Sequence, residues 1–240
     1  MTANRKALTY NVGVIQSEPD SKIHVDCQDA FEKGERQSGE VYYLSPPAKA
    51  KAAVKAVCIF DGFQGWNLIQ RRINGTTSFN QSYHKYHIGF GDMRNEYWIG
   101  LLGMRFLSLT NKFLTVHLES HDGEWRTANY SNFYIDGYVQ NYTAHIEGYS
   151  GDAGDALLAT DNSINGQQFS AYDKDNDASD DENCAAKYQG GFWYNNCSSS
   201  SINGPYQSNG TIQRPGLGMT WTPWKGPWYS LKTVYILLGR

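Results

Sequence analysis

Short runs in which apolar and polar residues alternate recur along the chain and predict a protein built largely of strands. The runs 57–60 (VCIF) and 66–72 (WNLIQRR) flank a DGFQG turn and predict two neighbouring strands. The run 113–120 (FLTVHLES) alternates like a half-buried strand, and residues 125–149 continue as alternating strands. The segment WYSLKTVYILL near residue 240 predicts a final strand. Together these runs favour a central antiparallel sheet.

Helical periodicity is limited to short segments. Ser78 and Gln81 have the spacing of a capping box, and aromatic residues recur at i, i+4 and i+7 from Phe79, so we predict a helix that begins at about Ser78. A second short helix is expected over residues 100–109. Residues 45–56 predict an exposed turn followed by a lysine-bearing strand or short helix.

Composition narrows the class of protein. Of the 240 residues, 19% are charged, 14% are aromatic and 24 are glycine, which favours a loop-rich α+β protein over a helical bundle. The net charge is −3 and no basic cluster stands out beyond Arg71 and Arg72, so nucleic acid is not an expected partner. No apolar run approaches the ~20 residues of a membrane helix, so membrane insertion is not expected.

The cysteines indicate an oxidising compartment. Four cysteines fall as two local pairs, for which three pairings are formally possible. The opening MTANRKALTY lacks the apolar core of a secretory signal, and we expect a signal to lie outside this sequence. Cysteines paired as disulfides would predict a secreted protein, and the alternative is a cytosolic protein with four free thiols. The four residues are Cys27, Cys58, Cys184 and Cys197.

An acidic loop is the main candidate for chemistry. Asp173, Asp175 and Asp177 alternate, so their carboxylates can converge on one centre, and calcium takes six to eight such oxygen ligands. The loop is not an EF-hand, because Ala178 stands where glycine is needed and Cys184 where a bidentate glutamate is needed. The alternative is a solvated acidic turn without an ion.

Catalysis is not expected. The serine run 198–201 has no nucleophile-elbow pattern, and the carboxylates cluster where a metal ion would neutralise them. The sequence therefore predicts a binding protein and no enzyme.

Motifs in a fixed order point to a known family. They are VYYL at 41–44, CIFDGFQGWNLIQRR at 58–72, GFG at 89–91, EYWIGL at 96–101, GYSGDAGDAL at 148–157, DKDND followed by NCA and KYQGGFWYNNC, INGPY at 202–206 and WTPWKGPWYSLK at 221–232. This series resembles the fibrinogen C-terminal domain family, which includes ficolins and tachylectin-like invertebrate lectins. The resemblance covers residues 24–240.

The resemblance implies a fold and an organisation. After an extension or linker at 1–23, it implies one fibrinogen-like α+β domain. A small disulfide-closed N-terminal part spans about 24–70. A central antiparallel sheet with short helices spans 71–150 plus 228–240, and an irregular calcium-bearing part with the ligand site spans 151–227. The implied disulfides are sequential, Cys27 with Cys58 and Cys184 with Cys197.

The resemblance also assigns the calcium ligands. The second and third aspartates of the family's motif correspond to Asp175 and Asp177, with loop carbonyls behind them. Six residues separate Asp177 from Cys184 where the family usually has five. Ser179 and Asp181 are the expected further ligands.

A ligand pocket beside the calcium loop is implied in part. Lectin members hold an acetyl group against a tyrosine that corresponds to Tyr188, with backbone N–H groups at a cis peptide that corresponds to Asn196-Cys197. The usual histidine is replaced by Ser198, and the usual Tyr-Ala pair by Pro215 and Gly216. The resemblance therefore does not extend to the acetyl-specific residues.

Aromatic residues offer a replacement surface, since exposed tryptophans stack on sugars or act as protein hot spots. Packing in the core is the expected role of Trp193, Trp221 and Trp224. The candidates for this surface are Tyr188, Trp193, Tyr194, Ser198, Tyr206, Trp221, Trp224 and Trp228.

The expected function is that of a secreted, calcium-dependent lectin that binds glycans or microbial surface groups and works as a homo-oligomer, because multivalency strengthens weak sites. The alternative is a fibrinogen- or angiopoietin-like module that uses the same pocket for a peptide or receptor. A purely structural matrix module is the third class. Sequons at Asn74, Asn80 and Asn209 are the expected glycan sites.

Overall fold

One large sheet organises the chain. The structure, a computed structural model, describes residues 22–45 and 53–240. Strands pair in the order β1-β2-β3-β4-β12-β7-β8-β9, and the antiparallel pair β5 and β6 adds beside β4. β1 and β2 are parallel, whereas the other neighbours in this order are antiparallel. The strands are β1 Ile23–His24, β2 Val41–Leu44, β3 Val54–Phe60, β4 Gly65–Arg72, β5 Phe90–Gly91, β6 Tyr97–Trp98, β7 Phe113–Glu119, β8 Trp125–Ile135, β9 Ala144–Gly151 and β12 Thr233–Gly239, with β10 Ser200–Ser201 and β11 Thr220–Trp221 paired separately.

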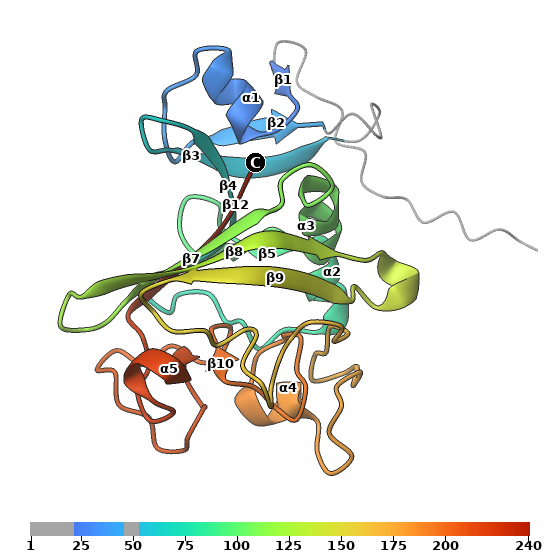
Figure 1. Cartoon of the computed structure of the whole chain (residues 1–240), viewed down its shortest axis with the longest axis vertical. Coiled ribbons are helices and arrows are strands. Elements are labelled where there is room, and N and C mark those ends of the chain that lie inside the picture. The colour runs from blue at the N-terminus through green and yellow to red at the C-terminus, as the bar shows by residue number, and fades with distance from the viewer. Residues whose placement is uncertain (1–21, 46–52) are drawn as a thin grey trace, which may run out of the picture.

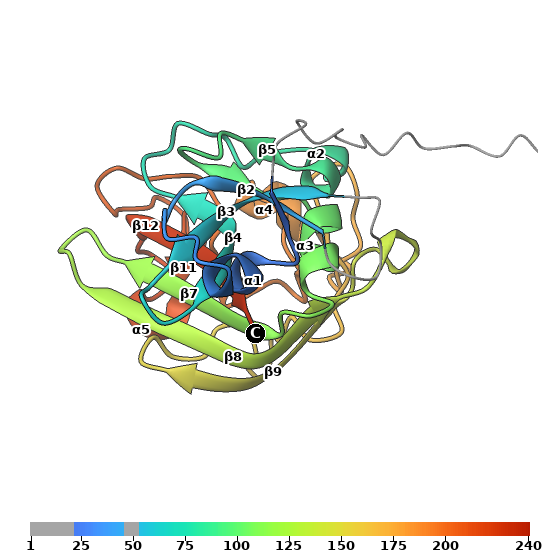
Figure 2. The same ribbon diagram turned by 90° about the horizontal axis from the view of Figure 1, so that it is seen from above.

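The helices are short and lie around this sheet. Figure 1 shows α1 with β1 and β2 at one end, the long strands β7, β8 and β9 across the middle, and α4, α5 and β10 at the other end. Seen from above, α1 lies over β4, on which it packs (Figure 2). This arrangement confirms the α+β architecture. The helices are α1 Cys27–Glu32, α2 Tyr83–Ile88, α3 Leu101–Leu107, α4 Cys184–Tyr188 and α5 Thr222–Lys225, with a 3-10 helix η2 at Tyr138–Gln140.

Both expected disulfides are present. Cys27, the first residue of α1, bonds to Cys58 in β3, and their Cα atoms are 5.4 Å apart. Cys184, the first residue of α4, bonds to Cys197. The sequential pairing implied by the family resemblance is therefore confirmed. Helices of five or six residues have few backbone hydrogen bonds and are marginally stable by themselves. Each disulfide therefore stabilises a short helix by bonding it to another segment of the chain.

The last strand lies in the middle of the sheet. β12 pairs with β4 on one side and with β7 on the other. Its apolar residues Val234 and Leu238 are fully buried, and Ile236 is nearly so. The prediction that the final strand returns to the central sheet is confirmed.

The predicted start of the helix near Ser78 is wrong. α2 begins at Tyr83, not near Ser78, and the N-cap is Ser82, whose hydroxyl accepts from the backbone N–H of Lys85. Gln81 does not close a capping box, because its side-chain amide donates to the Ser78 carbonyl. The second expected helix is confirmed as α3, which begins after Gly100.

The segment expected to form strands over 125–149 is interrupted. β8 ends at Ile135, and η2 and a turn precede β9. Asn141 and Tyr142 in this turn have positive φ angles of 47° and 55°, which extended strands do not allow. The turn lets Tyr142 fold inward, where it is buried.

Two expectations fall partly on residues that the structure does not describe. Most of the predicted extension 1–23 lies outside the described residues, and β1 begins at Ile23. The predicted turn after residue 45 also lies largely outside them, whereas the lysine-bearing strand is confirmed as β3, which includes Lys55. Within the described ranges, no helix has the length and apolar character needed to span a bilayer.

An aromatic core joins the C-terminal part to the sheet. Trp193 packs edge-on against Phe169 and donates its indole N–H to the Tyr142 carbonyl at 2.7 Å. Trp221 is fully buried and donates to the Gly154 carbonyl. The packing role expected for these two tryptophans is confirmed, and the acidic loop and α4 are thereby held against a rigid support.

Candidate functional site

The three alternating aspartates of the acidic loop have different hydrogen-bond partners. Asp173 accepts a hydrogen bond from the backbone N–H of Tyr83 at 2.7 Å and so holds the first turn of α2. This contact spans ninety residues of chain, and no local pattern signals it. The Asp173 carboxylate therefore has a structural role at the start of α2. Asp175 and Asp177 lie together further along the loop.

Asp175 and Asp177 form a carboxylate pair. Asp175 Oδ1 accepts from the Asp177 N–H at 3.3 Å, and the oxygens of Asp177 accept from the N–H groups of Ser179 and Cys184, each at 2.9 Å. Burial raises the pKa of the Asp177 carboxyl, the two backbone donors lower it, and the nearby Asp175 carboxylate raises it again, with a net rise. A cation beside the pair would relieve this repulsion.

The other expected ligands are placed differently. Ser179 lies next to the pair through its backbone N–H. Asp181 is exposed, and no hydrogen bond or ion pair of its side chain is found among the described residues. Across residues 22–45 and 53–240, no three His, Cys, Asp or Glu side chains gather as a metal site. The donor set that fits calcium is therefore two carboxylates completed by loop carbonyls and water, which are oxygen ligands that calcium accepts.

Tyr188 is the last residue of α4 and forms one wall of the expected ligand pocket. The N-cap of the helix is Asn183, whose side-chain oxygen accepts from the Ala186 N–H at 2.8 Å. The Tyr188 ring lies 5.8 Å from that of the buried Tyr194. Five residues of helix span about 7 Å, so Tyr188 lies within that distance of the disulfide-bonded Cys184.

Gly216 touches the face of Tyr188. A Cβ atom at Gly216 would lie 2.5 Å from Tyr188 Cε1, and its φ of 80° also favours glycine. The structure thus brings together Tyr188 and Gly216, as expected for parts of one pocket. Pro215 beside it is exposed.

The backbone around Cys197 has the cis peptide bond that the family resemblance implies. The Asn196-Cys197 peptide bond is cis. Asn195 donates its N–H to the Cys197 carbonyl at 2.8 Å. The Ser198 hydroxyl accepts from the Ser200 N–H at 3.1 Å, so Ser198 holds its own turn where the family usually has a histidine.

An exposed tryptophan follows a residue that is hydrogen-bonded to the Pro215 loop. The Gly216 N–H donates to the Pro227 carbonyl at 2.8 Å, which ties the Pro215 loop to the segment that carries Trp228. The side chain of Trp228 is 58% exposed, whereas Trp224 is half-buried and packs against the core. We call Tyr188, Pro215, Gly216, Pro227 and Trp228 the Tyr188 surface.

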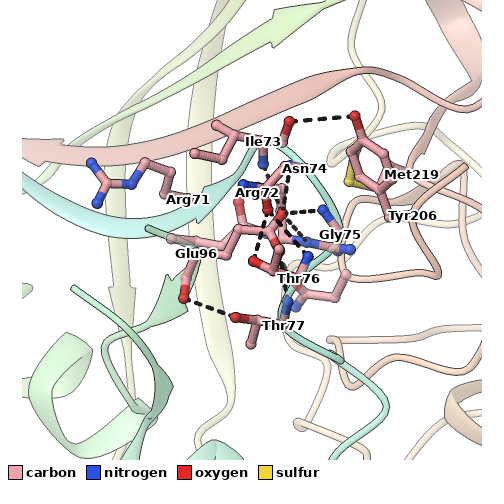
Figure 3. Close-up of polar contacts among 12 residues, drawn as sticks. Arg71, Arg72, Ile73, Asn74, Gly75, Thr76, Thr77, Glu96, Tyr206 and Met219 are labelled. Atoms are coloured by element: carbon pink, nitrogen blue, oxygen red, sulfur yellow. Dashed lines mark hydrogen bonds and ion pairs between the residues drawn. The ribbon is translucent and has the colours of Figure 1, made fainter. Parts of the chain in front are cut away.

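A second polar centre was not expected from the sequence. The buried Glu96 carboxylate accepts four backbone N–H groups of the turn that follows β4, at 2.8 to 3.0 Å (Figure 3). The INGTT turn offers these donors in sequence, but nothing local indicates that a carboxylate twenty residues away receives them. Glu96 also lies 3.9 Å from Nε of the buried Arg72. The four donors are the N–H groups of Ile73, Asn74, Gly75 and Thr77.

Comparisons with known proteins place the chain in a family. The family model for the fibrinogen beta and gamma chains, C-terminal globular domain, matches residues 23–239. Fibrinogen-like protein 1 of Bos taurus is 34% identical over 222 residues, which cover 88% of this chain and 70% of that protein. Angiopoietin-related protein 7 of Mus musculus is 37% identical over 212 residues, 87% of this chain and 61% of that protein.

Solved structures agree with the sequence matches. The fibrinogen-like globe domain of human ANGPTL2 has a TM-score of 0.84 and 31% identity, with 90% of this chain and 98% of that domain covered. Lamprey fibrin D-dimer in complex with the peptide ligand Gly-His-Arg-Pro-amide has a TM-score of 0.84 and 27% identity, with 90% of this chain and 73% of that one covered. The chain therefore belongs to the fibrinogen C-terminal domain family.

Proposed function

We propose that the protein is an extracellular, non-enzymatic recognition module that binds a peptide segment of a protein ligand at the Tyr188 surface. The observation that carries this proposal is the exposed Trp228, which directly follows Pro227, whose carbonyl accepts from the N–H of Gly216 beside Tyr188. A large aromatic side chain that is exposed next to a rigid pocket wall is the usual anchor of a protein interface. The two disulfides support an extracellular location.

The relatives favour the protein-binding alternative over the lectin. Fibrinogen-like and angiopoietin-related proteins are among the similar sequences, and a structural relative is solved with a peptide ligand. The acetyl-specific side chains are replaced by Ser198, Pro215 and Gly216, which supports the same choice. A glycan ligand, a homo-oligomer and glycosylation stay predictions from the sequence.

We also propose that Asp175 and Asp177 hold a calcium ion together with carbonyls of their loop. The support is the pairing of two carboxylates in a segment fixed by the Cys184–Cys197 disulfide. Bound calcium would neutralise this pair and stiffen the loop that leads into α4. Because α4 ends at Tyr188, calcium would then stabilise one wall of the binding surface.

The test selects peptides from a displayed random library against the purified chain in calcium buffer and measures each affinity by calorimetry. Trp228→Ala should weaken binding by roughly 30-fold, since an interface hot spot contributes about 2 kcal/mol. The control is Phe63→Ala, which removes an 89% exposed aromatic in the β3–β4 turn at the other end of the molecule.

Two results would overturn the proposal. One is a set of peptides whose affinity is unchanged by Trp228→Ala. The other is a library that yields no binder, together with a glycan array on which the folded, calcium-loaded chain binds sugars. The second result would restore the lectin expectation.

A further inference from the structure

A groove separate from the Tyr188 surface opens beside the turn that follows β4. Its volume is about 400 Å³. Figure 3 shows part of its wall, with Arg72 beside the turn and Tyr206 across from it. Gln189, which also lines the groove, directly follows Tyr188 in sequence. The groove is lined by Arg72, Gly75, Thr76, Thr77, Ser78, Phe79, Asn80, Gln189, Pro205 and Tyr206.

Arg72 lines this groove with a guanidinium group that the protein does not fully satisfy. The residue is only 1% exposed. Nη1 donates to the carbonyls of Ile202 and Gly204, at 3.1 and 2.9 Å. Nε has no hydrogen bond and lies 3.9 Å from Glu96 Oε1, and Nη2 makes no hydrogen bond within the described part of the chain. The buried Nε–H group of Arg72 therefore lacks an acceptor.

Arg72 forms an ion pair with Glu96 but no hydrogen bond to it. Burial lowers the pKa of Arg72 to about 10, and Glu96 offsets this only in part. The Glu96 carboxylate is engaged by four backbone N–H groups of the following turn. Both acceptors that Nη1 uses are neutral carbonyls. At neutral pH the guanidinium remains charged, and an anion in the groove would gain a charge-assisted hydrogen bond.

The rim of the groove carries further free polar groups. The hydroxyl of Ser78 and the side-chain amides of Asn80 and Gln189 have no hydrogen-bond partner among residues 22–45 and 53–240. Phe79 lies over the guanidinium at 4.0 Å, and Tyr206 closes the opposite wall against Gly75. Aromatic walls with amides and one cation match an amino-acid side chain that ends in a carboxylate.

We propose that this groove is a second subsite, which binds the carboxylate of an acidic residue in the protein ligand through Arg72. The inference rests on the proposed peptide-binding function and adds a preference to it. A peptide anchored at Trp228 and Tyr188 would continue past Gln189 and place an aspartate or glutamate side chain over Arg72. Ser78 and Gln189 would then bond the second carboxylate oxygen or the adjacent peptide backbone.

The direct test is an NMR titration of the isotope-labelled full chain with small probes at constant ionic strength. The probes are N-acetylglutamate amide, its neutral analogue N-acetylglutamine amide, and glucuronate. We expect saturable shifts of the Arg72 Nε–H and of the Asn80 and Gln189 side-chain amides with the glutamate probe. The glutamine probe should cause none.

Two variants at one position separate charge from shape. Ser78→Glu places a carboxylate of the protein itself in the groove, and Ser78→Gln adds a side chain of the same size without charge. We expect Ser78→Glu to weaken binding of the glutamate probe at least tenfold, as expected for competition with a charge-assisted hydrogen bond. Ser78→Gln should retain most of the affinity. Neither variant removes a hydrogen bond that holds the fold.

The outcomes keep this inference apart from the proposed function. Absence of saturable shifts, equal shifts with both blocked amino acids, or equal losses in both Ser78 variants would overturn the subsite. Binding of glucuronate alone would overturn its assignment to a protein ligand. If selected peptides lose affinity in Trp228→Ala but bind Ser78→Glu as they bind wild type, the Tyr188 surface stands and the groove proposal falls.

Discussion

Glu96→Gln tests the buried centre that shapes the turn after β4. Glutamine has nearly the same volume as glutamate, so packing is retained. One carboxylate oxygen becomes an amide NH2 group, which faces backbone N–H donors at 2.8 to 3.0 Å. The buried Arg72, 3.9 Å away, also loses its negative neighbour.

The expected cost is large. Removing one member of a buried charged pair costs about 3–5 kcal/mol, because the remaining charge stays desolvated. For a domain of this size, each kcal/mol lowers Tm by about 2–4 °C, which gives a fall of roughly 6–20 °C. Urea unfolding followed by tryptophan fluorescence measures the free-energy difference directly, as a lower midpoint at unchanged slope. The matched control is the exposed Glu124→Gln, whose ion pairs with Arg126 and Lys225 are screened by solvent and should contribute little to stability.

The pH dependence gives a second readout. Burial alone would raise the pKa of Glu96, but the four backbone donors outweigh it and hold that pKa below its usual value. Its contribution to stability is therefore fully present above the unfolded pKa of about 4.3 and is lost as pH falls through the lower folded pKa. The gap between wild type and Glu96→Gln should be constant near neutrality and shrink in acid. A gap under about 1 kcal/mol at neutral pH, or one that widens in acid, would refute this reasoning.

Three further changes have distinct expected results. Calcium at a hundredfold excess over its Kd should raise the free energy of unfolding by ~2.7 kcal/mol; in Asp175→Asn the calorimetric affinity should fall at least about tenfold, whereas Asp180→Asn should match wild type. Gly216→Ala should displace the Tyr188 ring and weaken peptide binding at least about tenfold, by forcing a Cβ into contact at a positive φ; unchanged affinity would contradict the pocket geometry. Replacing Cys184 and Cys197 together by serine should cost about 3 kcal/mol in chemical unfolding, because the bond closes a loop of sequence separation 13; no loss of stability would argue against that constraint.

Local patterns predicted the strands better than the contacts that join distant segments. β4, β7 and β12 follow apolar runs of the sequence. The period of two is visible in β7, where Leu114, Val116 and Leu118 alternate with polar residues, whereas β4 is buried along almost its whole length. The start of α2 was missed because the deciding contact comes from Asp173, far along the chain. Ser78 and Gln81 have the spacing of a capping box, but the N-cap of α2 is Ser82 and Gln81 donates to the Ser78 carbonyl instead.

In the candidate site, too, local motifs were easier to predict than contacts between distant segments. Asp175, Asp177 and Tyr188 could be named from motif and resemblance, and the structure places Gly216 against Tyr188 as the resemblance implied. Arg72 and Glu96 were not predicted as a functional centre. Arg72 ends the predicted strand 66–72 and Glu96 begins the EYWIGL motif, and the two charges meet because β6 pairs with β4.

The position of β12 bears on how the chain is made. Synthesis proceeds from the N-terminus, so β4 and β7 are complete before residues 233–239 emerge to lie between them. Until then both strands present unpaired edges, which are sites for aggregation. Arg240, at the end of β12, then bonds Asp26, the N-cap of α1, through both carboxylate oxygens. A chain that lacks β12 would therefore leave one edge of β4 and one edge of β7 unpaired. The domain can complete its sheet only after β12 has been synthesised.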